Sequence, residues 1–268
     1  ADRCENYEEN SLYLNRYPLV NRSAIKQTRR PRMSKTTGTT PDIPILHEDA
    51  HLLVIVKPPG LLSQKDRTGD PDLLTLCRGY LEQKHQRSGG QFLGLLHRLD
   101  RPVQGVMVLA KRPSAASHLS AQIRDHTFGK IYLAVVEGET PPNGVLVHHL
   151  VKDPSTNHVT ASRKETPGQT QRAELSFVRL DYHRDKNLSF LQIQLLTGRP
   201  HQIRVQFASE GYPLYGDQKY GYAGREDRTD PALFARGLKF RHPETGKPVT
   251  YTADPPDHYP WNLFRSGS

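Results

Sequence analysis

Two short segments hold most of the side chains that could do chemistry in this 268-residue chain. Residues 96–100 (Leu-His-Arg-Leu-Asp) place a carboxylate after an apolar residue and two bases. Residues 197–204 (Thr-Gly-Arg-Pro-His-Gln-Ile-Arg) place two arginines, a histidine and a glutamine where a helix is expected to begin. A carboxylate with a partner arginine from a distant segment suits carboxylate-driven chemistry on a polyanionic substrate, because the guanidinium keeps the carboxylate ionised.

Asp100 lies on a loop in the expected secondary structure. It precedes Arg101 and Pro102, and an apolar run at 105–110 predicts the strand that follows. Loops held by strands are favoured places for catalytic groups. A lone aspartate on a loop more often bonds nearby backbone, so the spacing alone leaves both interpretations open.

The elements that must position these segments follow a mixed α/β pattern. Apolar runs and alternating polarity predict strands, and a near-3.6 apolar spacing or a first-turn proline predicts helices. A charged separator at 183–187 predicts a hairpin. We expect an α+β fold with a mixed, largely antiparallel sheet and helices on its faces. The predicted strands are 52–56, 105–110, 130–136, 173–182, 188–196, 239–240 and 249–251, and the predicted helices are 70–86, 113–123 and 200–208.

The charge balance favours a polyanionic partner. The formal net charge is +9 at pH 7, and lysines and arginines placed on phosphates release counterions. A merely soluble basic protein would carry the same charge. After an acidic start, residues 16–41 contain basic but no acidic side chains and end in a Thr/Gly/Pro-rich run. We expect residues 1–41 to be a basic, poorly ordered arm, either RNA-contacting or solvated, and residues 42–268 to be a catalytic domain.

Several classes of protein are disfavoured. No apolar run approaches the about 20 residues that cross a bilayer, so we expect no membrane partner. Cys4 and Cys77 show no disulfide or zinc spacing, and the histidines are scattered without an HExxH pattern, so we expect no metal. No glycine-rich loop indicates a nucleotide cofactor. We expect a monomer in a reducing compartment, the cytoplasm by default, or a mitochondrion or other organelle if a presequence has been removed.

Five segments in order resemble motifs of the RluA-type pseudouridine synthases. Residues 97–105 resemble HRLDxxTSG, and residues 130–138 resemble KxYxAxVxG. Residues 197–205 match TGRxHQ(I/L)RV, residues 211–220 are similar to GHPIxGDxxYG, and residues 56–60 resemble NKPxG. The resemblance implies the pseudouridine synthase fold with a central RNA-binding cleft. It also implies isomerisation of a specific uridine to pseudouridine in structured ribosomal or transfer RNA, without a cofactor.

The chain departs from the family pattern at three places. Val103 and Gln104 replace the usual Thr-Ser, Val56 stands where Asn is common, and Phe234 occupies a usual His position. These departures leave the subfamily open.

The resemblance implies roles for nine residues. Asp100 would be the nucleophile, attacking the sugar C1′ or removing a sugar proton on a glycal route, and Arg204 would be its partner. The ring of Tyr132 would lie against the uracil. Arg98 would enter the RNA stack as the uridine flips out, or contact a phosphate. Lys57 is either a phosphate contact or a surface charge, and His97, Arg199, His201 and Gln202 are expected to shape the substrate-binding loops.

Two competing functions use the same residues differently. A non-catalytic RNA-binding protein of the same fold would not need Asp100, Tyr132 and Arg204, yet all three are present. A retaining glycosidase or base-excising hydrolase would need a second carboxylate at about 5 Å, and we identify none in the matched motifs.

Overall fold

A mixed β-sheet organises the described part of the chain, which in the computed structural model is residues 43–86, 89–221 and 230–264. Every strand pairing in it is antiparallel except β4 with β10. The prediction of a mixed, largely antiparallel sheet is therefore confirmed. The predicted N-terminal arm lies outside the described residues. The strands are β1 (Ile45–Glu48), β2 (Leu52–Lys57), β3 (Gly94–Leu95), β4 (Gln104–Ala110), β5 (Gly129–Glu137), β6 (Asn143–Asp153), β7 (His158–Ser162), β8 (Gln171–His183), β9 (Leu188–Leu195), β10 (Leu233–Arg241) and β11 (Pro248–Thr252).

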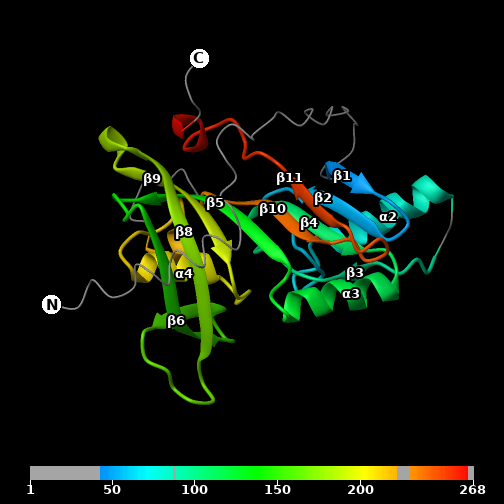
Figure 1. Cartoon of the computed structure of the whole chain (residues 1–268), viewed down its shortest axis with the longest axis horizontal. Coiled ribbons are helices and arrows are strands. Elements are labelled where there is room, and N and C mark those ends of the chain that lie inside the picture. The colour runs from blue at the N-terminus through cyan, green and yellow to red at the C-terminus, as the bar shows by residue number, and fades with distance from the viewer. Residues whose placement is uncertain (1–42, 87–88, 222–229, 265–268) are drawn as a thin grey trace.

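The strand order divides the sheet into two halves. Along its main path the order is β1-β2-β4-β10-β5-β9-β8-β6-β7, with β3 beside β4 and β11 beside β10. Figure 1 shows β10 between the β1–β4 half and the β5–β9 half. Strand β10 comes from the C-terminal part of the chain, whereas the strands of both halves come from residues before it. A C-terminal strand therefore joins the two halves.

Two helices cover opposite faces of the first half. Helix α2 (Leu73–His85) begins after Asp72, whose carboxylate accepts the backbone N–H of Thr75 at 3.1 Å. It packs Leu81 and its neighbours onto the face of β2 that carries Leu53 and Ile55. Helix α3 (Pro113–Arg124) begins with its proline, as predicted, and packs against the other face. Successive side chains of β2 point to opposite faces of the sheet, so the strand contributes to the hydrophobic core under α2 and to the one under α3.

The contact between β4 and β10 depends on a glycine. The two strands pair in parallel only at Gln104 with Phe234 and at Gly105 with Ala235. Gly105 has φ +132°, and a Cβ there would lie 2.4 Å from the carbonyl oxygen of Ala235. Any side chain at 105 would force the halves apart. Gln104 and Phe234, two departures from the family pattern, are register neighbours.

The second half contains the predicted hairpin. Strands β8 and β9 are joined by a 3-10 turn at Arg184–Lys186, and Asn187 closes it in the left-handed conformation. Strands β6 and β7, which follow β8 at the end of the sheet, were not predicted from the sequence. Strand β9 runs into the loop that precedes helix α4 (Gln202–Ser209), so the hairpin positions the second chemical segment.

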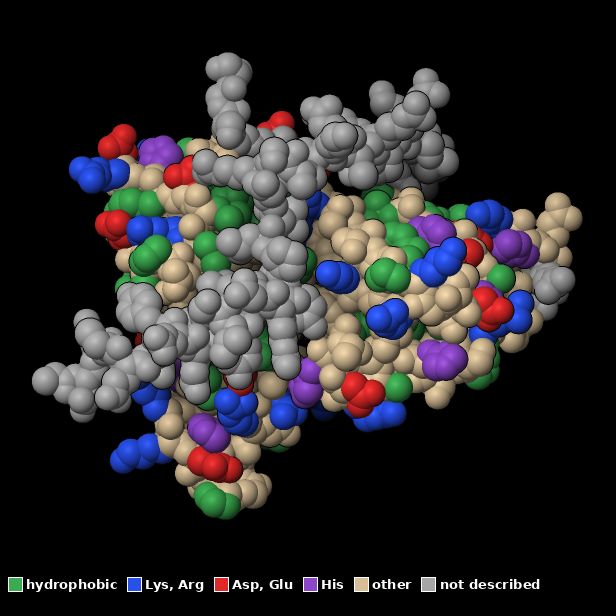
Figure 2. Space-filling view, viewed as in Figure 1, with side chains coloured by type: hydrophobic (Ala, Val, Ile, Leu, Met, Phe, Trp, Pro, Cys, Tyr) green, Lys and Arg blue, Asp and Glu red, His purple; other side chains and the backbone are tan. Residues whose placement is uncertain are grey.

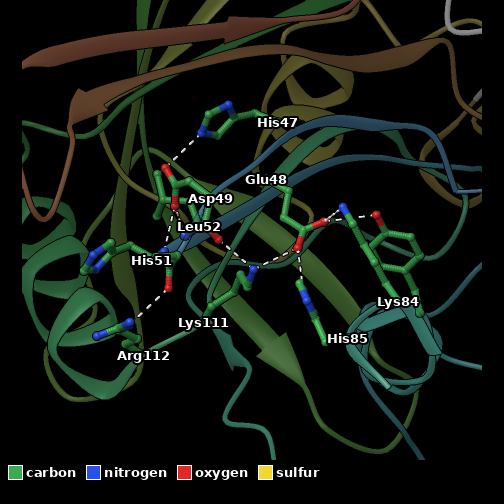
Figure 3. Close-up of polar contacts among 11 residues, drawn as sticks. His47, Glu48, Asp49, His51, Leu52, Lys84, His85, Lys111 and Arg112 are labelled. Atoms are coloured by element: carbon green, nitrogen blue, oxygen red, sulfur yellow. Dashed lines mark hydrogen bonds and ion pairs between the residues drawn. The ribbon is translucent and has the colours of Figure 1, made fainter. Parts of the chain in front are cut away.

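A charged cluster closes the β1–β2 turn, and we name it the turn cluster (Figure 3). Its first carboxylate, Glu48, accepts hydrogen bonds from Tyr80 at 3.0 Å, Lys84 at 2.6 Å, His85 at 3.0 Å and Lys111 at 2.8 Å. The donors come from helix α2 and from the residue that follows β4. The turn cluster therefore fastens three elements of the first half together.

The second carboxylate of the turn cluster is Asp49. One of its oxygens accepts the backbone N–H groups of His51 and Leu52, both at 2.7 Å. The other contacts the Nε2 atoms of His47 and His242, both at 2.9 Å. These contacts attach the turn to the segment that follows β10.

Two features are absent from the described residues. No helix among them is long and apolar enough to cross a membrane. No group of three or more metal-ligating side chains gathers within the same residues.

Candidate active site

Arg204, on the first turn of α4, is the centre of a buried ion-pair group. Its Nε and Nη2 atoms donate to the two carboxylate oxygens of Asp217 at 2.7 and 2.8 Å. The side chains of Arg204 and Asp217 are only 6% and 2% exposed. A bidentate pair of this kind fixes the plane of the guanidinium. Burial acts to lower the pKa of Arg204, but the two carboxylates more than offset it and raise that pKa, so the guanidinium stays charged.

Asp100 accepts a hydrogen bond from the remaining nitrogen, Nη1, of the same guanidinium. Nη1 of Arg204 donates to one carboxylate oxygen of Asp100 at 3.1 Å, across 104 positions of sequence. The Asp100 side chain is 25% exposed, unlike Asp217. The two chemical segments predicted from the sequence therefore meet. Asp100 is held by a fixed cation on one side and faces solvent on the other.

The loop that carries Asp100 is anchored on both sides. The Ser63 hydroxyl donates to the carbonyl of Leu99 at 2.8 Å, and Leu99 N–H donates back to that hydroxyl at 3.2 Å. Val103 N–H donates to the carbonyl of Asp100 at 3.0 Å, closing a tight turn. These bonds fix the backbone on which the carboxylate stands.

Lys57 is the third anchor of this loop, which corrects both expectations for it. Its side chain is fully buried, so it is neither a surface charge nor exposed to a phosphate. Its Nζ donates to the carbonyls of Pro58 at 2.9 Å, Leu61 at 2.7 Å and Arg101 at 3.0 Å. Burial lowers the pKa of Lys57 to about 7, with the Asp100 charge acting against that shift. Lys57 therefore positions the residue next to Asp100.

Tyr132 lies on β5 and is 7% exposed, as part of the hydrophobic core that also contains Leu99 and Ile203. Burial raises the pKa of its hydroxyl, and the negative charge of Asp100 raises it further. The hydroxyl is therefore protonated at neutral pH. A protonated phenol near a carboxylate can donate a proton or a hydrogen bond but cannot act as a base.

His201 and Tyr220 form a pair beside Arg204. His201 adopts φ +53° immediately before α4, and its Nδ1 lies 2.5 Å from the Tyr220 hydroxyl. That hydroxyl accepts the backbone N–H of Val159 on β7 at 3.1 Å. The Arg204 guanidinium lies 5.1 Å from the centre of the Tyr220 ring. Tyr220 thus ties the edge strand β7 to the site.

Gln202 organises the loop before α4. Its side-chain oxygen accepts from the Thr197 hydroxyl at 2.8 Å and from Arg199 N–H at 3.0 Å, and its amide donates to the carbonyl of Glu174 at 3.0 Å. The side chain is buried, and its three hydrogen bonds hold the shape of this loop. Arg199 is exposed, with Nε donating to the carbonyl of Arg172 at 3.1 Å. The helix begins at Gln202, so the predicted start at 200 is wrong: the left-handed backbone of His201 cannot continue a helix.

His97 and Arg98 have opposite environments. Nε2 of His97 accepts the backbone N–H of Val108 on β4 at 3.2 Å. Burial lowers the pKa of His97 to about 3, so the ring is neutral and structural. Arg98 is exposed, and within the described residues it makes no hydrogen bond or ion pair. Of these two neighbours, only Arg98 is placed to reach a bound polymer.

Sequence reasoning missed two contributors to this site. Asp217 and Tyr220 both lie in the matched segment 211–220, but the sequence analysis assigns no role to them. The expectation of no second carboxylate in the matched motifs is therefore wrong, because Asp217 reaches the opposite side of Arg204 from Asp100. Asp217 uses both oxygens on Arg204 and is almost fully buried, so it is not available as an acid or base on substrate.

Comparisons with known proteins agree on one family. The family profile described as RNA pseudouridylate synthase matches residues 51–209. The chain is 33% identical over 230 residues to the "Ribosomal large subunit pseudouridine synthase D" of Zymomonas mobilis, covering 80% of this chain and 70% of that protein. It is 30% identical over 252 residues to the "Uncharacterized RNA pseudouridine synthase YhcT" of Bacillus subtilis, covering 90% and 80%.

A solved structure has the same fold. The human protein "RNA Pseudouridylate Synthase Domain Containing 4" superposes with a TM-score of 0.65 at 24% identity, covering 80% of this chain and 88% of that one. The predicted α+β pseudouridine synthase fold is confirmed. The chain belongs to the family of RNA pseudouridylate synthases, isomerases that convert uridine in RNA to pseudouridine.

Proposed function

We propose that this enzyme isomerises a specific uridine of large-subunit ribosomal RNA, with Asp100 as nucleophile. The observation that carries the proposal is the partly exposed carboxylate of Asp100, held by one hydrogen bond from a guanidinium that Asp217 fixes. The relatives' names, which specify ribosomal large-subunit synthases, support the choice of RNA. Transfer RNA is the alternative target.

The reaction needs one bond broken and one formed. The N1–C1′ bond of the uridine breaks, the uracil rotates, and a C5–C1′ bond forms while C5 loses a proton and N1 gains one. Asp100 either attacks C1′ or removes a sugar proton to give a glycal, and both routes remain open. Product and substrate contain the same atoms, so the balance requires no cofactor.

Three further residues are assigned supporting parts. Arg204 keeps Asp100 ionised and oriented. The protonated hydroxyl of Tyr132 stands under the uracil and takes part in proton handling. Arg98, exposed on the Asp100 loop, enters the RNA stack or contacts a phosphate as the nucleotide flips out, because a base within a helix cannot otherwise reach the carboxylate.

The surface charge supports an RNA partner only in a general way. Figure 2 shows lysine and arginine side chains spread over both halves of the visible face. A net charge of +9 attracts RNA from solution. Recognition of one uridine must then come from RNA shape and the flipped nucleotide. A central cleft for RNA and a monomeric, cytoplasmic enzyme remain part of the proposal.

The first test is tritium release from RNA labelled at uridine C5. Wild type should release tritium from unmodified large-subunit ribosomal RNA, and Asp100→Asn should release none. Asp185→Asn, an exposed aspartate on the β8–β9 turn, is the matched control and should behave as wild type. Release of free uracil would instead indicate a base-excising hydrolase. Tight binding without release from either RNA class would indicate the non-catalytic RNA-binding alternative.

A further inference from the structure

Lys130 lies near two segments of the site, the loop that precedes α4 and the segment that leads to Asp100. It lies two residues before Tyr132 on β5, so the two side chains leave the same face of the sheet. Its Nζ reaches the loop after β9: a Cβ built at Gly198 would lie 3.2 Å from that nitrogen. Its charge also adds to the effect of burial in lowering the pKa of His97, which precedes Asp100 by three residues.

The Lys130 ammonium differs from the other buried cations. Lys57 donates to three carbonyls, Arg204 to two carboxylates, and Lys111 to Glu48 and to a carbonyl. Within the residues that the structure describes, the ammonium of Lys130 makes neither a hydrogen bond nor an ion pair. Burial lowers its pKa, and no nearby carboxylate offsets this. A half-buried cation without a partner destabilises the free protein.

We propose that Lys130 binds a backbone phosphate of the RNA beside the target uridine. The inference rests on the proposed function, since RNA is the polyanion that would bring a phosphate to this position. An ammonium is a compact charge with three donors and suits a single phosphate oxygen. Arg98 and Arg199, each exposed on one of the same two segments, would take the flanking phosphates.

The principal variant is Lys130→Met, which keeps the aliphatic stem and removes the charge. Loss of one charge-assisted hydrogen bond should raise KM for the ribosomal RNA about tenfold and leave kcat near wild type. The slope of log Kd against log salt, from filter binding of the same RNA, should decrease by about one. The melting temperature of the free protein should not fall. Lys186→Met, on the exposed β8–β9 turn, is the matched control and should change none of these values.

A second variant, Gly198→Ala, moves the ammonium without removing it. Gly198 is not in the left-handed region, so alanine is compatible with its backbone, but the new methyl group displaces Nζ by a few tenths of an ångström. We expect KM to rise about threefold in the wild-type background and not at all in the Lys130→Met background, because contacting groups couple. Additive effects of the two changes would contradict the proposal.

The outcomes separate this proposal from the one on which it rests. A wild-type enzyme that releases no tritium contradicts the proposed function, and the salt slope of RNA binding still tests Lys130. An active wild type with unchanged KM, Kd and salt slope in Lys130→Met overturns the phosphate site. A fall in melting temperature with unchanged RNA affinity would do the same, since it would show that Lys130 only supports the fold.

Discussion

Asp100 and Glu48 are both carboxylates that receive basic side chains from distant parts of the chain, yet their surroundings differ. Glu48 accepts hydrogen bonds from four side chains and is 8% exposed. Asp100 accepts one side-chain bond, from Arg204, and is 25% exposed. A carboxylate whose oxygens are all occupied can only hold elements together. One that is oriented by a single partner keeps a lone pair for a substrate.

The cations differ in the same way. In the turn cluster (Figure 3), Lys84 and Lys111 both reach Glu48 itself. In the active site, two of the three guanidinium nitrogens of Arg204 donate to Asp217, which takes no further part. The buried carboxylate of Asp217, both of whose oxygens accept hydrogen bonds from Arg204, therefore positions the guanidinium that orients Asp100. We expect substitutions in the two regions to separate activity from stability.

Asp100→Asn should give the largest effect on activity. The amide keeps the size of the side chain but is not a nucleophile, so kcat should fall at least about a thousandfold. RNA affinity should stay nearly intact, because Arg204 remains neutralised by Asp217. Single-turnover tritium release and filter binding would measure the two quantities. A fully active variant would remove Asp100 from the chemistry.

Arg204→Ala should affect both activity and stability. It leaves Asp217 as an almost fully buried carboxylate without its partner, which we expect to cost about 3–5 kcal/mol of the free energy of unfolding. Most activity should be lost as well, since Asp100 is no longer oriented. Arg204→Lys is the control: it restores charge but not the two-pronged geometry, so it should recover stability more than activity. Unchanged urea midpoints and kinetics would exclude Arg204 from the site.

Glu48→Gln should affect stability alone. We expect a loss of about 2 kcal/mol at pH 7 with unchanged kcat and KM. Burial acts to raise the pKa of Glu48, but Lys111, Lys84, His85 and Tyr80 together lower it to about 2. Since the unfolded value is 4.5, the stabilisation is complete above pH 4.5 and disappears as pH falls to 2. Urea midpoints of both proteins should therefore converge in acid; a constant difference would contradict this origin.

Tyr220→Phe and Tyr80→Phe form the finest comparison. Tyr220→Phe keeps the ring over Arg204 but leaves Val159 N–H and His201 without their hydrogen-bond partner. We expect kcat to fall several-fold and the free energy of unfolding to decrease by about 1 kcal/mol. The second removes one of four donors to Glu48 and should cost at most about 1 kcal/mol with no kinetic change. Equal kinetics for both variants would show that the Tyr220 contacts do not support the site.

Local sequence pattern predicted the elements that position the site. The apolar run of β2, the first-turn proline of α3 and the charged β8–β9 turn are short-range signals, and the structure confirms all three. The meeting of Asp100 with Arg204 came from the family resemblance, because no local pattern specifies a contact across 104 positions.

The errors arose where tertiary contacts override local preference. A lysine is expected on the surface, but Lys57 is buried because three carbonyls from turns at 58, 61 and 101 converge on its ammonium. Pro200 indicated that the helix begins at 200. His201, which contacts Tyr220, instead adopts a left-handed backbone, so the helix begins at Gln202. The role of Asp217 depends on Arg204 alone. Arg101, Tyr220 and Arg204 are distant in sequence from the residues they contact, and Pro58 and Leu61 reach Lys57 only because the chain turns back on it.

The place of β10 in the sheet also sets when the enzyme can become active during its own synthesis. Asp100 belongs to the half that ends with β4, and Arg204 to the half that begins with β5. Among the described strands, the halves pair edge to edge only through β10, which ends at Arg241. A nascent chain that has not yet released residues 233–241 from the ribosome has no strand to join the two halves. The ion pair between Asp100 and Arg204 therefore forms late in translation, and partly made chains should bind RNA without modifying it.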